Sequence, residues 1–378
     1  MLAVALSVAV MMVSVAVVVG FKQEINEKIT GFTGDVQIAR FSDENTFESH
    51  PIEKSDSLSS VLLDFPFVEK VQPYAIKAAI LKSSSEWEGV VLKGVENNFS
   101  FNFLEKQLVS GRLPDFNADK REALISEKQA NKLGLKVDED AILFFVQDPP
   151  VQLKIKVVGI YNTELEEIDD RFMLGNISLI QNVNEWDSSI IGGYQVDLID
   201  NDLELLLART NEIRYAINIH LNARSVTERY PQIFDWLELL NMNILIIMVL
   251  MIGVAVVNMV TVILILILEK TQMVGILKSI GMNAISLRKV FVYNGGWFVL
   301  TGLILGNLVG IGAMLFESHF QLISISPDTY YISKVPIAFT WGYWLLINVG
   351  TLLICLLTMV LPAYMVGRIK PVKALRFS

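Results

Sequence analysis

The sequence predicts a membrane protein with four transmembrane helices and a large extracytoplasmic α+β domain between the first and the second of them. Three observations support this fold class. The chain of 378 residues contains four long apolar runs without a charged residue. Most of its charged residues lie between the first two runs. Lysine and arginine dominate two of the short segments next to the later runs.

Each apolar run is long enough to cross a bilayer as a helix. The shortest, residues 2–20, has 19 uncharged residues, and the others are longer. A bilayer core of ~30 Å needs about 20 helical residues. Core helices of soluble proteins are shorter and carry a polar face, which these runs lack. We therefore predict membrane spans at residues 1–20, 242–268, 290–316 and 335–367.

The segment of residues 21–241 differs from the rest of the chain in charge. It holds 37 acidic and 22 basic residues, a net charge of −15, whereas the whole chain has a net charge of −9. Such an acidic domain repels a phosphate backbone, so nucleic acid is not an expected partner. The single cysteine, Cys355, lies in the last apolar run. The exported domain must therefore be stable without disulfides, which its size permits.

The orientation follows from the basic residues of the short segments. Residues 269–289 carry four basic residues and one acid, and the tail of residues 368–378 carries four basic residues and no acid. Residues 317–334 have one basic and two acidic residues. The first two segments, and both chain ends, are thus expected in the cytoplasm. A signal peptide would carry basic residues before its apolar core, and here no basic residue precedes Lys22. An uncleaved first span therefore fits better, and we expect that the chain starts late.

Two helical stalks are predicted to connect the domain to the membrane. Phe21, Ile25 and Ile29 continue the first span at a spacing of four, which indicates a stalk over residues 21–32. An amphipathic stretch at residues 227–241 leads into the second span. Between the stalks, alternating apolar residues predict strands, with short helices among them. The predicted ranges are strands at 35–41, 68–83, 89–96, 153–161, 194–200 and 217–221 and helices at 54–65 and 210–216. The domain is α+β, with one or two lobes.

Motifs for catalysis and metal binding are missing. The chain has no G-x-x-x-x-G-K-[ST], no H-E-x-x-H and no G-x-S-x-G, and His50, His220 and His319 lie far apart in the sequence. The acidic run at residues 164–170 is typical of a solvated loop rather than of a calcium site. We expect no catalytic residue, no metal ligand and no cofactor in this chain.

Residues 269–289 combine a helical apolar stripe with glycines and lysines. The stripe follows the i, i+3, i+4, i+7 pattern at Met273, Ile276, Leu277 and Ile280. Lys270 and Lys278 lie off it, and Gly275 and Gly281 each cost ~1 kcal/mol relative to alanine in a helix. Glycine allows another backbone to approach closely, and Gly281 could also end the helix. The pattern fits a helix that docks on another protein and, equally, an interfacial helix on anionic lipid.

Polar and small residues also occur within the predicted spans. Asn258 and Asn348 lie in apolar surroundings, where an unpaired amide is costly. A hydrogen bond between helices is the simpler interpretation for Asn258, and a role in a lipid site is the alternative. The third span contains Gly295, Gly296, Gly302, Gly306, Gly310 and Gly312. This spacing suits close helix packing, either within the subunit or at a dimer interface.

Several stretches resemble ABC transporter permeases of the MacB/LolC/FtsX class over nearly the whole chain. "TQMVGILKSIGM" is similar to the coupling helix of that class, with Gln272 where glutamate is common and Ser279 where alanine is common. The ending "RIKPVKALRFS" resembles the common terminus of the class, and "VVGIYNTELEEIDDRF" resembles its periplasmic core domain. "IFDWLELLNMN" looks most like the lipoprotein-releasing permeases LolC and LolE, and Asn258 matches an asparagine common among them.

The resemblance implies a function and partners. It implies that the coupling residues are Met273, Val274, Gly275, Ile276, Leu277, Lys278 and Gly281. The packing role of Gly302, Gly306 and Gly310 is instead predicted from their small-residue spacing. A cytoplasmic ABC ATPase dimer would bind ATP and Mg, and a second, identical or sister, permease subunit would complete the transporter. Its cargo would be lipoproteins, drawn from the lipid of a bacterial inner membrane and passed to a periplasmic carrier. The alternatives are a MacB/FtsX-type permease for efflux or for activation of a cell-wall hydrolase, and a membrane-tethered sensor without an ATPase.

Overall fold

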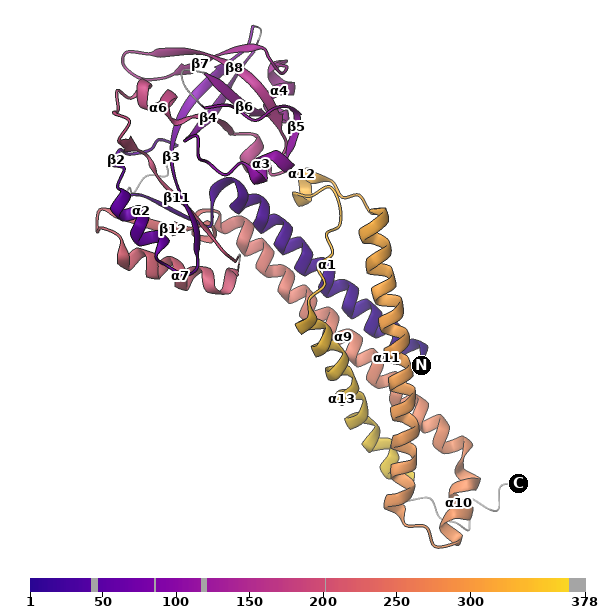
Figure 1. Cartoon of the computed structure of the whole chain (residues 1–378). Helices are drawn as coiled ribbons and strands as arrows, with labels where there is room; N and C mark the ends of the chain where they lie inside the picture. Colours follow the sequence, from indigo (N-terminus) through magenta and orange to yellow (C-terminus); the bar gives the residue numbers. More distant parts are fainter. Residues whose placement is uncertain (42–46, 85, 117–120, 201, 367–378) are drawn as a thin grey trace. The chain divides into compact units, whose positions relative to one another are not determined.

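A computed structural model describes residues 1–41, 47–84, 86–116, 121–200 and 202–366 of the chain (Figure 1). The predicted terminal motif at residues 368–378 lies outside these residues. The chain divides into two compact units. The helical unit comprises Met1–Gln23, Asp235–Ser324 and Lys334–Ser378, and the core unit comprises Glu24–Phe234 and Ile325–Ser333.

Among the described residues, four helices are long and apolar enough to cross a membrane, as the sequence predicted. They are α1 (Leu2–Thr33), α9 (Pro231–Glu269), α11 (Ala284–Phe320) and α13 (Trp341–Val366). At 1.5 Å per residue the 39-residue helix α9 is about 58 Å long, well beyond a ~30 Å bilayer core. The helices therefore continue past the apolar runs that define the predicted spans.

The ends of these helices follow local chemistry. Helix α1 runs without a break through the predicted stalk at residues 21–32. The predicted stalk helix at 227–241 is instead divided, because the short helix α8 (Val226–Arg229) has its own capping box and Pro231 begins α9. Residues 335–340, predicted as part of the last span, precede α13, since Pro336 lacks an N–H and disfavours a helix before it.

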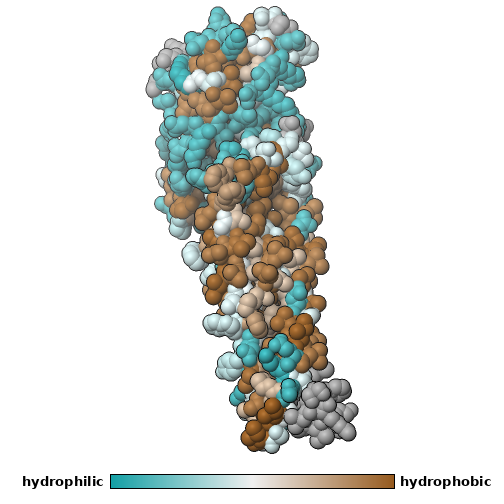
Figure 2. Space-filling view, turned by 90° about the vertical axis from the view of Figure 1, so that its right-hand side faces the viewer, coloured by the Kyte–Doolittle hydropathy of each residue, from teal (hydrophilic) through white to brown (hydrophobic). Residues whose placement is uncertain are grey.

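The four helices share one apolar core. Side chains from α1, α9, α11 and α13 meet in a buried cluster that includes Val8, Met259, Phe291 and Met359. In its most apolar window α1 is half buried, whereas the corresponding windows of α9 and α13 are only 22% buried. The remaining apolar surface of α9 and α13 suits lipid or another protein. Figure 2 shows mostly hydrophobic surface over the helical unit and mostly hydrophilic surface over the core unit on the face it presents.

The core unit contains the strands and the short helices. The strands are β1 (Val36–Arg40), β2 (Ile52–Glu53), β3 (Val68–Lys82), β4 (Trp87–Val95), β5 (Leu108–Gly111), β6 (Glu122–Ser126), β7 (Asp140–Phe145), β8 (Val151–Tyr161), β9 (Phe172–Asn176), β10 (Ile190–Ile191), β11 (Gly193–Leu198) and β12 (Leu221–Ser225). The short helices besides α8 are α2 (Asp56–Leu63), α3 (Asn102–Lys106), α4 (Glu127–Leu133), α5 (Glu166–Asp169), α6 (Ile177–Val183), α7 (Leu203–Ala216) and α12 (Pro327–Tyr330). The predicted α+β class is confirmed.

Strand β3 connects the two halves of the core unit. The main sheet has the order β12-β1-β11-β3-β4-β9-β6-β8-β5, and β7 pairs with both β3 and β8. Strands β3, β4, β9, β6, β8 and β7 thus pair in a closed ring. The first part of β3 pairs with β11, and its last residues pair with β7. One 15-residue strand is therefore shared by an open sheet and the ring, which agrees with the two-lobe alternative.

Helix and turn signals decide most element ends in the core unit. A capping box of Ser126 and Gln129 begins α4, and Gly134, with φ of 65°, ends it. The strand predicted at residues 217–221 is wrong for its first four residues. Asn218 forms a turn there, accepting hydrogen bonds from the backbone N–H groups of His220 and Leu221, and β12 begins only at Leu221.

Candidate functional site

A short helix, α10 (Thr271–Ser279), lies between the long helices α9 and α11. It ends in a glycine motif. The N–H of Met282 donates to the carbonyl of Leu277 (3.0 Å), and the N–H of Gly281 donates to the carbonyl of Lys278 (3.1 Å). Gly281 has φ of 97°, a left-handed conformation that costs a residue with a Cβ atom. Gly281 therefore stops the helix and turns the chain toward α11.

The predicted coupling residues lie on two different faces of α10. Val274 is fully buried, Gly275 is buried, and Leu277 packs against the core of the helical unit. Met273 and Ile276 are exposed by 40% and 45%. The sequence placed Leu277 on the same stripe as Ile276, whereas the structure turns it toward the bundle.

The outward face of α10 is both apolar and close to basic groups. Ile280, after the helix, is 78% exposed and extends the surface of Met273 and Ile276. Lys270 forms an ion pair with Glu269 (2.9 Å), and Lys278 is half buried. The Arg288 guanidinium stacks over the Tyr364 ring of α13, 4.2 Å from its centre. Such a surface can bind an apolar groove with acidic edges or the headgroup region of a bilayer.

The predicted packing glycines of α11 face α1 of the same chain. A Cβ atom on Gly306 would lie 2.7 Å from the carbonyl oxygen of Ala5, and one on Gly302 would lie 3.0 Å from the Cβ of Val4. A Cβ on Gly310 would lie 3.3 Å from the Cα of Ala9. These three glycines therefore let two helices of one subunit approach closely.

The intramembrane asparagines differ in their partners. Asn258 donates to the carbonyl of Val254 on its own helix (2.9 Å), and the described residues show no bond from it to another helix. Asn348 of α13 instead exchanges hydrogen bonds with Asn307 of α11, at 2.6 and 3.3 Å. The indole N–H of Trp344 also donates to Asn307 (2.6 Å). We did not single out Asn307 from the sequence, although a lone asparagine in an apolar run is a usable signal.

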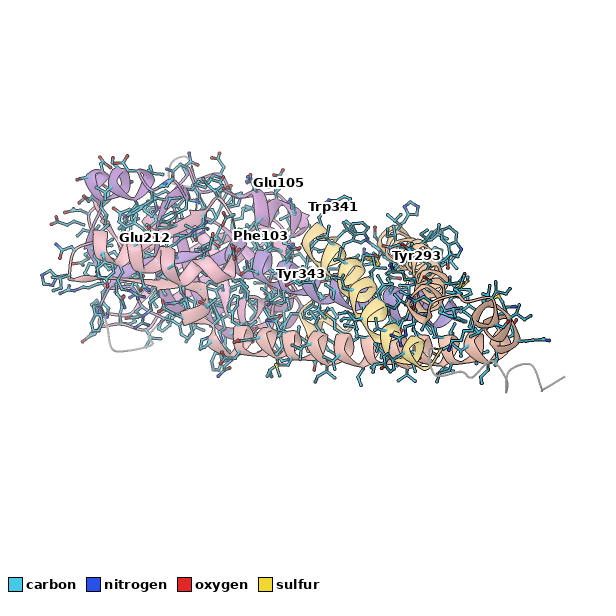
Figure 3. All side chains as sticks on the ribbon, turned by 90° about the horizontal axis from the view of Figure 1, so that it is seen from below. Phe103, Glu105, Glu212, Tyr293, Trp341 and Tyr343 are labelled. Carbon is cyan, nitrogen blue, oxygen red and sulfur yellow. The ribbon has the colours of Figure 1, made fainter. Side chains whose placement is uncertain are left out.

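Aromatic side chains mark both ends of the helical unit. Trp341 contacts Phe339 and Trp344 edge-on, with ring centres 5.1 and 5.6 Å apart. Figure 3 shows Trp341 and Tyr343 at the start of α13 and Tyr293 on α11. Tryptophan and tyrosine favour the two interfaces of a bilayer. The apolar part of the unit between these residues is therefore suited to the hydrocarbon region of a bilayer.

A buried lysine holds the end of α1 in the core unit. The Lys93 ammonium of β4 donates to the carbonyl of Phe32 in the last turn of α1 and to Gln195 Oε1 (2.7 Å). It also lies over the Phe32 and Phe99 rings. Burial lowers the pKa of Lys93 to about 7. Its positive charge suits the carbonyl end of a helix, which carries partial negative charge. No sequence signal identified Lys93.

The acidic run at residues 164–170 is not a solvated loop throughout, so that prediction is wrong for two of its members. Glu164 accepts from buried Lys28 (2.6 Å) and from the backbone N–H of Ser333 (3.2 Å). Asp169 is buried and accepts from Thr163. Burial raises the pKa of Asp169 to about 6, although these hydrogen bonds lower it. Among the described residues, no group of three or more His, Cys, Asp or Glu is placed to hold a metal ion.

These features together define a class: a multi-pass membrane protein with four apolar helices, a separate α+β domain and a short amphipathic helix between two of the spans. Residues 1–201 match the MacB-like periplasmic core domain family, and residues 245–371 match the FtsX-like permease C-terminal family. The chain belongs to the MacB-like periplasmic core domain family and carries the FtsX-like permease region, which confirms the resemblance seen in the sequence. Four spans and a periplasmic-type domain fit a multi-pass inner-membrane protein.

Relatives over the full length carry names from one system. The chain is 22% identical to the lipoprotein-releasing system transmembrane protein LolC of Xylella fastidiosa (strain 9a5c), a match that covers 100% of this chain and 92% of the relative. It is 22% identical to the LolE protein of Haemophilus influenzae (strain ATCC 51907 / DSM 11121 / KW20 / Rd), with 98% and 92% covered. The crystal structure of the periplasmic region of MacB from Actinobacillus actinomycetemcomitans is similar with a TM-score of 0.37 and 14% identity, covering 53% of this chain and 92% of that one.

Proposed function

We propose that this chain is the permease subunit of an ABC transporter that extracts lipoproteins from the bacterial inner membrane. The observation that carries the proposal is its full-length similarity to LolC and LolE proteins. In this proposal the core domain lies in the periplasm between the first and second spans, and α10 and both termini lie in the cytoplasm. A partner ATPase binds ATP and Mg, and this chain supplies no catalytic group.

The exposed face of α10 is the proposed contact with the ATPase. Its support is the division of the helix into an inner face, with Val274 packed in the bundle, and an outer face of Met273 and Ile276. A partner that presses on the outer face meets a helix that is seated on the bundle, so the displacement passes to α9 and α11. The left-handed turn at Gly281 keeps α10 short and sets its angle to α11.

Motion of the spans would reach the core domain along continuous helices. Helix α1 runs from Leu2 to Thr33 without interruption. Its last turn is held by buried Lys93, which bonds Phe32 and Gln195 in the core unit. A shift of α1 along its axis would therefore act directly on strands β4 and β11. This link supports mechanical coupling between the spans and the core domain. The proposal further includes lipoprotein as cargo, a second permease subunit across the transporter and a periplasmic carrier as recipient.

Charge added to the outer face of α10 tests the proposal. We expect Ile276→Glu to abolish co-purification of the ATPase and to leave the permease folded, because the side chain is exposed. Gln272→Glu is the matched control: it adds the same charge to the same helix at another exposed position and should retain the ATPase. Retention of the ATPase by Ile276→Glu would contradict the assigned contact.

Depletion of the protein tests the cargo. Lipoproteins destined for the outer membrane should accumulate in the inner membrane when the chain is depleted, and wild-type protein should restore their release whereas Ile276→Glu should not. Normal lipoprotein sorting together with a captured periplasmic adaptor or wall hydrolase would instead indicate the MacB/FtsX-type alternative. Normal sorting without any bound ATPase would indicate the tethered sensor.

A further inference from the structure

We propose that the core unit contains a binding pocket for a phosphate group, lined by arginines on one face of its open sheet. This inference does not depend on the transport function. The pocket is formed where β1, β11, β12 and β3 lie side by side and α8 follows β12. Its principal lining residues are Gln37, Arg40, Tyr74, Asn222, Arg224 and Arg229.

The strand register places Gln37, Asn222, Arg224 and Tyr74 on one face, and Arg40 lines the pocket from the end of β1. Gln37 and Ala39 of β1 pair with Arg224 and Asn222 of β12. On the other side Ala39 pairs with Gly193, which in turn pairs with Tyr74 of β3. Residues paired directly across neighbouring strands share a face of the sheet. Ala39 has a short side chain and lines the hollow, whereas the Tyr74 ring covers Gly193.

The pocket collects positive charge within a strongly acidic segment. Arg40, Arg224 and Arg229 line it, and among the described residues none of them forms an ion pair with a carboxylate. The one acid of the lining, Glu48, is directed to Lys77 at 3.6 Å. Like charges gathered in one pocket repel one another, and a bound anion would relieve such repulsion among the three guanidinium groups. Residues 21–241 carry a net charge of −15, so this cluster is not a general property of the surface.

The positive charge of Arg229 influences the pKa of two buried groups near the pocket, Tyr74 and Lys93. Burial raises the pKa of the Tyr74 hydroxyl, and the Arg229 cation opposes this rise. Burial lowers the pKa of Lys93, Asp197 opposes this lowering, and the Arg229 cation adds to it to a smaller extent. The Arg229 cation therefore acts on groups at the buried side of the pocket, and such a cation attracts a dianion more strongly than a monoanion.

The size and chemistry of the pocket select a small oxyanion. Its volume of about 80 Å³ is well below the ~300 Å³ at which pockets for drug-sized ligands begin, so a phosphate group fits and a whole nucleotide does not. Guanidinium groups bind phosphate through paired N–H donors. The Asn222 amide can add a hydrogen bond to a remaining oxygen. Gln37 Nε2 donates to the Thr33 carbonyl (2.9 Å), which leaves its second N–H for the anion, and the Tyr74 hydroxyl donates to Gln37 Oε1 (3.5 Å). The phosphate can be free or part of a lipid headgroup.

Phosphate titration of the full-length protein in non-ionic detergent tests the proposal. Thermal unfolding is followed while inorganic phosphate replaces chloride at constant ionic strength. We expect a saturable rise of the melting temperature, and roughly tenfold weaker apparent affinity in Arg224→Gln and in Arg40→Gln. Arg40 is exposed at the end of β1, so its replacement should leave folding unchanged. Arg121→Gln, an equal charge change at an exposed position outside the pocket, should bind like wild type.

A second titration separates the two sources of phosphate. The probe is phosphatidylglycerol with six-carbon acyl chains, used as a monomer. If it binds more tightly than inorganic phosphate, the ligand is a lipid headgroup; if it binds equally or more weakly, the ligand is free phosphate. Either result supports the pocket if Arg224→Gln weakens it. The proposal is overturned if neither probe gives a saturable shift, if the arginine variants bind as well as wild type, or if hexaglutamate binds and phosphate does not.

Discussion

Replacement of Gly306 by alanine tests the close packing of α11 on α1. The added Cβ would lie 2.7 Å from the carbonyl oxygen of Ala5, 2.9 Å from the Cβ of Val8 and 3.1 Å from the Cα of Ala5. Ordinary contacts begin near 3.4 Å, so α1 would have to move by about 0.7 Å. Two of these atoms belong to backbone and cannot rotate away. Overpacking of this kind costs about 1–3 kcal/mol, and helices in lipid depend on such packing because the hydrophobic effect does not favour their association.

A control in the same helix separates packing from helix propensity. Alanine favours a helix over glycine by ~1 kcal/mol. Gly312→Ala has this gain, and its new Cβ would meet no atom within 4 Å. Thermal unfolding of the purified protein, followed by the fluorescence of its six tryptophans, should therefore rank Gly312→Ala at or above wild type and Gly306→Ala below it. Equal melting temperatures of the two variants would refute the assigned contact, as would a change in oligomeric state with unchanged stability of the subunit.

Three further predictions concern buried charges of the core unit. Burial lowers the pKa of Lys93 in the folded protein to about 7, so between pH 7 and 10.5 this side chain binds more protons in the unfolded protein than in the folded one. The free energy of unfolding of the wild type should therefore rise with pH over that range. Lys93→Met should remove the rise. Burial raises the pKa of Asp35 in the folded protein to about 7, so between pH 4 and 7 this side chain binds more protons in the folded protein than in the unfolded one. The free energy of unfolding should therefore fall as the pH rises through this range. Denaturant titration of Asp35→Asn should show no such fall. Glu164→Gln leaves Lys28, only 5% exposed, without its carboxylate and should lower the free energy of unfolding by roughly 1–3 kcal/mol. Glu166→Gln, which weakens an exposed pair with Lys128, should cost less than ~1 kcal/mol; an equal loss in both variants would contradict the importance of burial.

Features that depend on local chemistry could be predicted from the residues alone. An uncharged run of about 20 residues must be helical in a bilayer, because every backbone N–H and C=O has to be satisfied within the segment. The four apolar helices therefore followed from run length alone. The stripe and the glycines of residues 271–282 likewise predicted a short helix that ends near Gly281, since both signals act within one or two turns.

The neighbours that these elements meet became known only from the folded chain. Periodicity placed Leu277 and Ile280 on one stripe, but Leu277 is partly buried against the bundle whereas Ile280 is exposed. The acidic run has the composition of a solvated loop, but in the structure Glu164 pairs with Lys28, which lies 136 residues earlier in the chain. Such contacts depend on strand pairing and helix packing over long sequence distances, and a pattern of neighbouring residues carries no record of them. The same reason hid the arginine pocket, whose members come from β1, β12 and α8 and meet only in the folded sheet.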